Sequence, residues 1–238
     1  MIVLLKLLLA HLIADFLLQP RNWVLDKEQK KAGSGKLYLH VLLHGILTLL
    51  LLWDWSFWWM ALLIMVMHGL VDIIKLYAQT EATRVGWFIA DQLLHGFTLI
   101  AVWYAWFQPE FHPIEESLHS LVWVYATAVL FLTAATGIII QILLTNFSKQ
   151  ISDGPDESLA SAGKYIGILE RLLIFVFIVT GHWEGVGFLL AAKSIFRFGD
   201  LKESKDRKLT EYILIGTLLS FGIAIITGIT VVGITAVL

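Results

Sequence analysis

Apolar stretches long enough to cross a membrane recur along the chain, and short polar stretches separate them. A membrane-spanning helix needs about 20 mostly apolar residues. The pattern predicts eight helices, of which the seventh is short enough to be re-entrant rather than spanning. Their predicted ranges are 2–19, 38–54, 57–78, 86–107, 118–146, 163–181, 184–197 and 210–237. We therefore expect an all-α, polytopic transmembrane helical bundle with seven to eight spans.

The composition supports a membrane protein and excludes several kinds of site. Hydrophobic residues make up 58% of the 238 residues and charged residues 15%, whereas soluble domains average about 45–50% and about 25%. Cysteine is absent, which excludes disulfides, thiolate zinc sites and iron–sulfur clusters. The first apolar run lacks a basic leader and contains His11 and Asp15, so we do not expect a cleavable signal peptide.

Lysine and arginine accumulate in alternate connections. The connections 20–37, 79–85, 147–162 and 198–209 contain lysine or arginine, whereas 53–58, 108–117 and 181–184 contain neither residue type. The positive-inside rule places the basic connections in the cytoplasm. With eight spans, both termini then face outward.

Four pairs of metal-ligand residues stand at i, i+4 spacing inside the first four apolar stretches. An ionisable side chain at membrane depth costs at least ~2.5–3.5 kcal/mol, so each pair suggests a function. Residues four apart lie on one face of a helix. The predicted topology places every pair within roughly 5–12 Å of the cytoplasmic surface. We therefore expect one cluster of His11, Asp15, His40, His44, His68, Asp72, Asp91 and His95.

The same pairs indicate an internal repeat. The segment that begins at His11 resembles the segment at His68, and the segment at His40 resembles the one at Asp91. The first two helices should then superpose on the next two about an axis near the membrane normal. This divides the chain into a four-helix metal-site half, 1–107, and a second transmembrane half, 108–238. Glycines follow three ligand histidines and would allow close helix packing: Gly45, Gly69 and Gly96.

Imidazole and carboxylate ligands without sulfur suit Zn, Mn or Fe. Eight ligands exceed the four of one tetrahedral site, so two divalent ions fit better. Paired ions can produce a hydroxide nucleophile and clamp a phosphoryl oxygen. Some of the eight residues could instead orient the ligands from a second layer. The predicted catalytic and orienting residues are Asp72, Asp91, Lys75 and Gln92.

The second half offers a candidate anion site. A basic pocket at the cytoplasmic side would bind an anionic headgroup or phosphate, with Glu170 paired to Lys193 or Arg197. The predicted substrate-binding residues are Glu170, Arg171, Lys193 and Arg197. The alternative is that these cations only anchor the helices at the membrane surface.

The motif order resembles a known family. His-x₃-Asp-Phe, His-x₃-His, His-x₃-Asp-x₂-Lys and Asp-Gln-x₂-His, followed by Gly-x₂-Ile-Gly-x-Leu-Glu-Arg, resemble an uncharacterised family of bacterial inner-membrane proteins of unknown function. The first half is also distantly similar, in chemistry and topology, to membrane-bound metal-dependent hydrolases. The resemblance implies a multi-pass protein of the bacterial inner (cytoplasmic) membrane.

Three functions remain open. The first is a metal-dependent hydrolase that acts at the cytoplasmic leaflet on a phosphate-containing amphiphile. The second is a divalent-metal transporter or ion-coupled carrier; such proteins hold their sites near the midplane on discontinuous helices, and no proline interrupts the first four stretches. The third is a structural membrane subunit. The expected partners are a lipid bilayer and an amphiphilic phosphate, with no nucleic acid, and the oligomeric state stays open.

Overall fold

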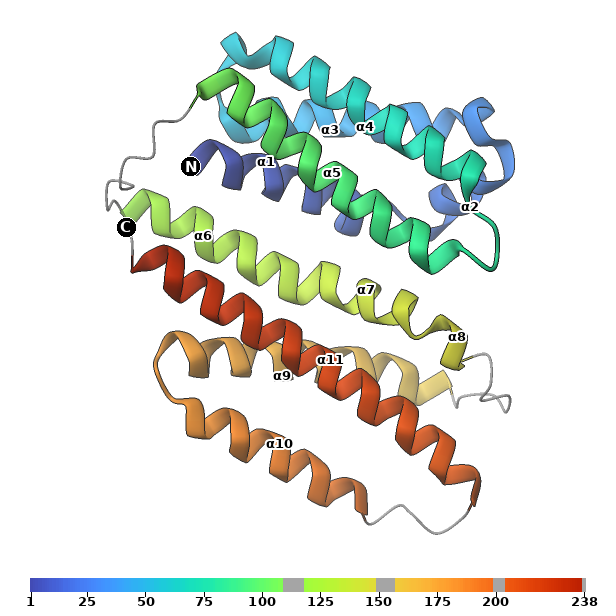
Figure 1. The fold of residues 1–238 in the computed structure, drawn as a ribbon, viewed down its shortest axis with the longest axis vertical. Coiled ribbons are helices and arrows are strands. Elements are labelled where there is room, and N and C mark those ends of the chain that lie inside the picture. The colour runs from blue at the N-terminus through green and yellow to red at the C-terminus, as the bar shows by residue number, and fades with distance from the viewer. Residues whose placement is uncertain (109–117, 149–156, 199–203, 237–238) are drawn as a thin grey trace. The chain divides into compact units, whose positions relative to one another are not determined.

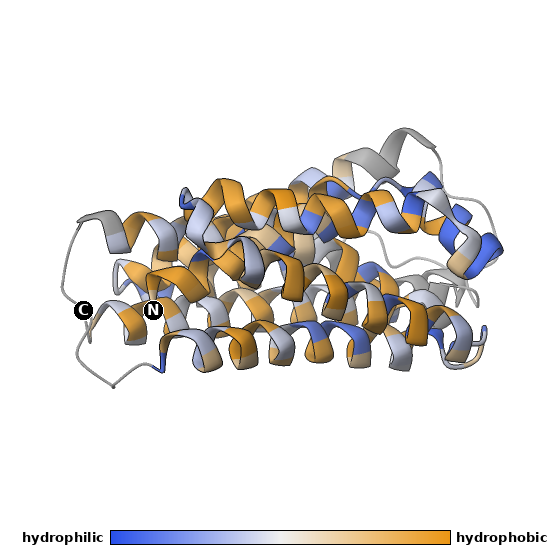
Figure 2. Cartoon of the chain, turned by 90° about the horizontal axis from the view of Figure 1, so that it is seen from above, coloured by the Kyte–Doolittle hydropathy of each residue, from blue (hydrophilic) through white to orange (hydrophobic). Residues whose placement is uncertain are grey.

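The computed structural model describes residues 1–108, 118–148, 157–198 and 204–236, and every regular element within them is a helix. The predicted all-α class is confirmed (Figure 1). The chain divides into two compact units, Met1–Thr127 and Ala128–Leu238. Figure 2 shows that hydrophobic residues dominate most helices and that hydrophilic residues interrupt some of them.

The first unit holds the helices that carry the predicted ligands. These are α1 (Ile2–Leu12) with the π-helical segment η1 (Ile13–Leu17), α2 (Arg21–Lys30) with the 3₁₀ turn η2 (Lys31–Gly33), α3 (Gly35–Leu52), the 3₁₀ turn η3 (Trp55–Phe57), α4 (Trp58–Ala78) and α5 (Arg84–Phe107). Helix α6 (Leu118–Leu130) begins in this unit and ends in the second.

Short polar side chains cap the start of α3 and the start of the 3₁₀ turn η3 that leads into α4. The Ser34 hydroxyl accepts a hydrogen bond from the Leu37 amide at 3.3 Å and so caps α3. At its other end, Trp53 adopts the left-handed conformation with φ 57°. The Asp54 carboxylate then accepts the Ser56 amide at 2.8 Å. This tight connection makes α3 and α4 adjacent helices.

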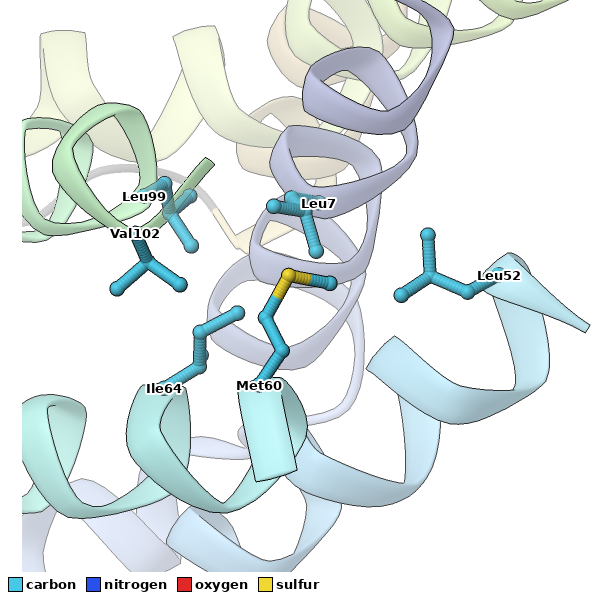
Figure 3. Packing of buried hydrophobic residues seen from close by; sticks show 6 residues of the cluster. All are labelled: Leu7, Leu52, Met60, Ile64, Leu99 and Val102. Atoms are coloured by element: carbon cyan, nitrogen blue, oxygen red, sulfur yellow. The ribbon is translucent and has the colours of Figure 1, made fainter. Parts of the chain in front are cut away.

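Helices α1, α3, α4 and α5 form a closed four-helix ring. Helix α1 packs against α3 and α5, and α4 packs against the same two helices. A hydrophobic cluster fills part of the ring (Figure 3). Its buried members are Leu7, Leu52, Met60, Ile64, Leu99 and Val102.

Two of the three glycines after ligand histidines lie at a close helix contact. A Cβ at Gly45 would lie 2.1 Å from Met65 Sδ, and one at Gly69 would lie 3.2 Å from Val41 Cγ2. Both contacts join α3 to α4. Gly96 differs, because no heavy atom of the chain lies within 4 Å of its ideal Cβ beyond its own helix backbone. The expectation of close packing there is wrong.

The prediction of a loop at 20–37 is also wrong in part, because this connection contains helix α2. Pro20 directly precedes α2 and is extended, with φ −70° and ψ 155°, which does not continue a helix. The helix axis turns by 85° between Ile2–Leu17 and Arg21–Gly33. Helix α2 is rich in charged residues, so a search for apolar stretches does not detect it.

The second unit contains the end of α6 and the remaining helices. These are the π-helical segment η4 (Phe131–Ala135), α7 (Thr136–Leu143), α8 (Thr145–Ser148), α9 (Glu157–Val179), α10 (Trp183–Phe198) and α11 (Ser204–Thr235). Helix α11 packs along α9 and also contacts α7, and α10 packs on α9.

Helix length and hydropathy make this a multi-pass membrane protein. Five helical segments are long and apolar enough to span: Gly35–Leu52, Trp55–Ala78, Arg84–Phe107, Ser120–Leu143 and Thr210–Thr235. The bent pair Ile2–Leu17 and Arg21–Gly33 gives a sixth if it counts as one span. The predicted seven to eight spans are not shown. Helix α10 has 16 residues, or about 24 Å of helix against about 30 Å of hydrocarbon, and the apolar part of α9 includes Lys164, Glu170 and Arg171.

Candidate metal centre

The structure brings all eight predicted ligands into one cluster inside the four-helix ring. Each of the segments α1–η1, α3, α4 and α5 contributes one i, i+4 pair. Seven of the eight residues are buried, and the Asp15 side chain is 10% exposed. Every member has a nitrogen or oxygen atom within 4.0 Å of another member. Their role as metal ligands stays a prediction.

Asp15 lies at the centre of one side of the cluster. Its Oδ1 is 3.1 Å from His44 Nε2 and 3.2 Å from His40 Nε2. His68 Nε2 lies 3.8 Å from the same oxygen. Asp15 belongs to the π-helical segment η1, where the helix is locally wider, and such segments are frequent at functional sites.

The other side of the cluster is built around His95. Its Nε2 lies 3.3 Å from Asp91 Oδ1 and 3.7 Å from Asp72 Oδ1. Between the two sides, His40 Nε2 and His68 Nε2 face each other at 3.1 Å. All five histidines therefore contribute Nε2 to the interior of the cluster.

The three carboxylates share one arrangement. In each, Oδ1 lies within 4.0 Å of at least one histidine nitrogen, while Oδ2 accepts a hydrogen bond from a side chain at the edge of the cluster. Two histidines also approach an Oδ2 atom: His11 lies 3.7 Å from that of Asp15, and His40 lies 3.9 Å from that of Asp72. Lys27 donates to Asp72 at 2.7 Å, and Lys75 donates to Asp91 at 2.8 Å. Gln92 donates to both Asp15 and Asp91 at 3.2 Å. These donors hold the carboxylates so that the inner oxygens converge.

The atoms at the centre of the cluster could hold a metal ion. Two ligands at about 2.0–2.1 Å from a tetrahedral ion lie roughly 3.3 Å apart, close to several distances above. Buried Asp91 Oδ1 and His95 Nε2 are 3.3 Å apart, yet neither has a well-aligned hydrogen bond among the described residues. Buried polar atoms normally have partners. A cation between them would satisfy both.

The cluster contains three overlapping groups of residues, and within each group the ligand atoms all lie within 4.8 Å of one another. The first contains four residues of the Asp15 side, the second joins the two sides, and the third surrounds His95. They are His11, Asp15, His44 and His68; His40, His68 and Asp72; and Asp72, Asp91 and His95.

Lys27 is a member of the site that the sequence did not reveal. Its charge counted only toward a basic loop, but the structure buries it to 6% exposure against Asp72. The neighbouring contacts Lys31 Nζ to the Leu76 carbonyl, at 2.5 Å, and Arg84 to Glu28, at 2.7 Å, join this segment to α4 and α5.

The fixed charges of the site nearly cancel. Three carboxylates give −3 and the two lysines +2, so the formal sum is −1 with neutral histidines. A buried site with an excess of negative charge and several lone pairs favours cation binding.

The four residues predicted to bind substrate lie in the second unit. Lys193 pairs with Glu170 at 2.5 Å, one of the two predicted pairings, and the Arg197 side chain lies outside the described residues. Arg171 is buried and donates to the Leu132 carbonyl at 2.6 Å. A cavity shared between these residues and the His/Asp cluster stays a prediction.

The fold and the cluster define a class: a multi-pass membrane protein with buried His/Asp groups that could hold metal ions. Comparison with known families is more specific. The family described as "Protein of unknown function (DUF3307)" matches residues 3–125, which is more than half of the chain and includes all eight cluster residues. The chain belongs to this family. No curated protein and no solved structure matches the chain.

Proposed function

We propose that this protein is an integral-membrane, metal-dependent hydrolase that acts at the cytoplasmic leaflet on a phosphate-containing amphiphile. The observation that carries the proposal is the convergence of five imidazole nitrogens and three carboxylates in one buried cluster. A purely structural polar layer would need fewer groups, because each buried ionisable side chain is costly in a membrane.

We infer that the cluster binds two divalent ions of the Zn, Mn or Fe type. His11, Asp15, His44 and His68 would hold one ion, and Asp72, Asp91 and His95 the other. His40 lies between the two groups, within 3.9 Å of both Asp15 and Asp72. When bound, such a pair supplies a hydroxide nucleophile and neutralises charge on phosphoryl oxygens.

The charge of the site supports an anionic substrate. Its formal sum of −1 becomes +3 with two divalent ions, from −1 + 4. A buried excess of this size needs anionic ligands, and a hydroxide together with a phosphate would provide them. Lys27 and Lys75 hold the outer oxygens of Asp72 and Asp91, so the same ammonium groups can donate to phosphate oxygens.

Residues of the site divide the remaining work. In the reaction, the water oxygen bonds to phosphorus, the phosphorus–oxygen bond to the lipid breaks, and a proton passes to the departing alcohol. Asp91 and Lys75 form the proton-handling pair, since they share a short hydrogen bond. Gln92 orients Asp15 and Asp91 through its amide. Asp72 serves as ligand and as partner of Lys27.

A specific observation favours a second candidate, a divalent-metal or ion-coupled carrier. Carriers place their sites on discontinuous helices. The first helix is discontinuous here, with a π segment that contains Asp15 and then a bend of 85°. The first helix thus breaks at its end, even though no proline interrupts the first four apolar stretches. The absence of proline there therefore counts less against a carrier.

Metal analysis and phosphate release test these functions on the full-length protein. We expect the purified wild type to contain a divalent metal and to release inorganic phosphate from phosphatidic acid in vesicles. His44→Ala should lose both properties. Asp54→Asn is the matched control, because Asp54 is a capping residue outside the cluster.

The possible results separate the three functions. Metal with phosphate release supports the hydrolase. Metal without release, but with metal uptake into protein-containing vesicles, supports the carrier and contradicts the hydrolase. Protein without metal under metal-replete conditions contradicts both and leaves the structural subunit.

A further inference from the structure

The second unit contains a buried arginine that carries no ion pair with a carboxylate among the described residues. Arg171 in α9 is 4% exposed. Its Nε donates to the Leu132 carbonyl at 2.6 Å, and its Nη1 donates to Ser220 Oγ at 3.2 Å. Both acceptors are neutral. The adjacent carboxylate, Glu170, is paired with Lys193 instead.

Charge in this region does not balance. Glu170 contributes −1 and Arg171 and Lys193 contribute +2, so the formal sum is +1. Leaving a charge buried without a partner is strongly unfavourable, and at membrane depth such residues usually face a partner or a ligand. An anion is the group that would compensate this excess.

The surroundings of the guanidinium are built from small residues and a modified helix. A Cβ added at Gly167 would lie 3.2 Å from Nη1, and one at Gly137 would lie 3.8 Å from Nη2. Two carbonyl groups of the π segment Phe131–Ala135 accept hydrogen bonds from side chains. The Phe131 carbonyl accepts one from Thr136 Oγ1 at 2.8 Å, and the Leu132 carbonyl accepts one from Arg171 Nε. π segments are frequent at functional sites. The two glycines let the backbones of α9 and α7 lie beside Nη1 and Nη2, where an added methyl group would lie against the guanidinium.

We propose that Arg171, together with Ser220 and the Glu170–Lys193 pair, forms an anion site in the second unit that binds the phosphate group of a membrane lipid. An arginine fork matches a phosphate with two parallel hydrogen bonds. Ser220 on α11 provides a hydroxyl next to the same nitrogen. Lys193 lies 5.7 Å from the Phe221 ring centre, beside Ser220 in sequence, and adds a second positive charge. This site is independent of the metal hypothesis, because none of its residues belongs to the His/Asp cluster.

The test uses full-length, metal-free protein in three samples: phosphatidylcholine vesicles, the same vesicles with inorganic phosphate, and vesicles that also contain phosphatidic acid. Bound lipid is counted by native mass spectrometry, and stability is followed by intrinsic tryptophan fluorescence on heating. We expect phosphatidic acid alone to bind and to raise the unfolding temperature. Stabilisation by inorganic phosphate to the same degree would assign the site to free phosphate and overturn the lipid part of the proposal.

Variants locate the effect. Arg171→Gln should weaken phosphatidic acid binding about 10- to 100-fold, the range expected for loss of a charged hydrogen bond. Arg171→Lys keeps the positive charge but lacks the guanidinium fork, and it should give an intermediate loss of binding. It serves as the test if Arg171→Gln does not fold. Lys164→Gln is the matched control, since it removes a cation from an exposed position of the same helix. Wild-type protein that neither binds nor responds to phosphatidic acid overturns the proposal, as does equal weakening by Lys164→Gln and Arg171→Lys.

Discussion

The two units meet the cost of buried charge in opposite ways. The cluster of the first unit has three carboxylates, two ammonium groups and five imidazoles, with a formal sum of −1. The region around Arg171 in the second unit has one carboxylate and two cations, with a sum of +1. Both sit among apolar helices, so neither excess can be left to water.

The difference predicts the ligand of each region. A negative excess with many lone pairs calls for a cation, and a positive excess with a buried arginine bonded only to neutral acceptors calls for an oxyanion. In the first unit the histidines favour a metal ion in particular, because a neutral Nε2 atom can bind a metal but does not balance the charge of a carboxylate. Loss of a central ligand should therefore affect one region without affecting the other.

The largest expected effect is the loss of metal when the central carboxylate is removed. Asp15→Asn keeps the shape of the side chain but removes the oxygen charge that faces His40, His44 and His68. Metal affinity should fall at least about a hundredfold, since even outer-layer partners are worth 10–100-fold. Elemental analysis after equilibrium dialysis measures it.

Arg171→Gln sharpens the comparison from the other side. It should leave metal content at the wild-type level, because the residue belongs to the second unit. Parallel loss of metal in both variants would contradict the separation of the two charge regions.

The next effect concerns the buried ammonium of α2. Lys27→Gln leaves Asp72 without its ion-pair partner, and breaking a buried pair costs about 3–5 kcal/mol. We expect the metal-free protein to lose that much unfolding free energy in denaturant titrations. Added metal should restore part of the loss, since a cation then compensates Asp72 and stabilises the folded state by mass action.

Lys30→Gln is the control on the same helix. Lys30 pairs with Asp26 but is 61% exposed, and surface pairs contribute only about 0–1 kcal/mol. Equal destabilisation by the two lysine variants would show that Lys27 acts as an ordinary surface residue.

A smaller effect tests how the first ring packs. Gly45→Ala places a methyl group against Met65, and overpacking typically costs about 1–3 kcal/mol, toward the lower end where a flexible methionine can move. Gly96→Ala meets nothing within 4 Å and should be neutral or stabilising by up to about 1 kcal/mol through helix propensity. Unfolding free energies of the two variants, measured side by side, give the comparison. A reversed order would contradict the close contact of α3 with α4.

The smallest effect involves a carboxylate outside both regions. The amide of Ser56 donates to Asp54 and lowers the pKa of that carboxyl below its usual value. A depressed carboxyl pKa contributes stability above the unfolded-state value of about 3.9, and this contribution is lost as pH falls through the folded-state value. Asp54→Asn should therefore lose less stability on acidification than the wild type, as measured by unfolding temperature at neutral and acidic pH. An equal fall in unfolding temperature for variant and wild type would contradict a stabilising role of the Asp54–Ser56 hydrogen bond.

Several features of the candidate site could be predicted from the sequence. The i, i+4 spacing of His11 and Asp15, repeated three more times, placed each pair on one helix face. Alternating basic connections indicated that the pairs share a depth, and the structure brings the eight side chains together. Lys75 and Gln92 were predicted because Lys75 lies one turn beyond Asp72 and Gln92 stands beside Asp91, and both donate a hydrogen bond to Asp91.

The prediction failed where local hydropathy does not report on tertiary structure. Helix α2 is polar, so it was assigned to a loop, and the burial of Lys27 depends on a bend that brings α2 back toward α4. The count of seven to eight spans rested on apolar runs, yet α10 is only 16 residues long. Close packing at Gly96 failed because a small residue permits a helix contact but does not create one.

By itself, the sequence determined the helical class, the membrane environment and the eight residues of the His/Asp cluster, because periodicity and hydropathy are local properties of the chain. Only the tertiary structure decided which carboxylate oxygen faces which histidine, that Lys27 neutralises Asp72, and that Arg171 bonds to neutral oxygens. Those pairings join residues 39 and 45 positions apart in the chain. Such contacts depend on how helices pack around a core, and no pattern within a single helix specifies them.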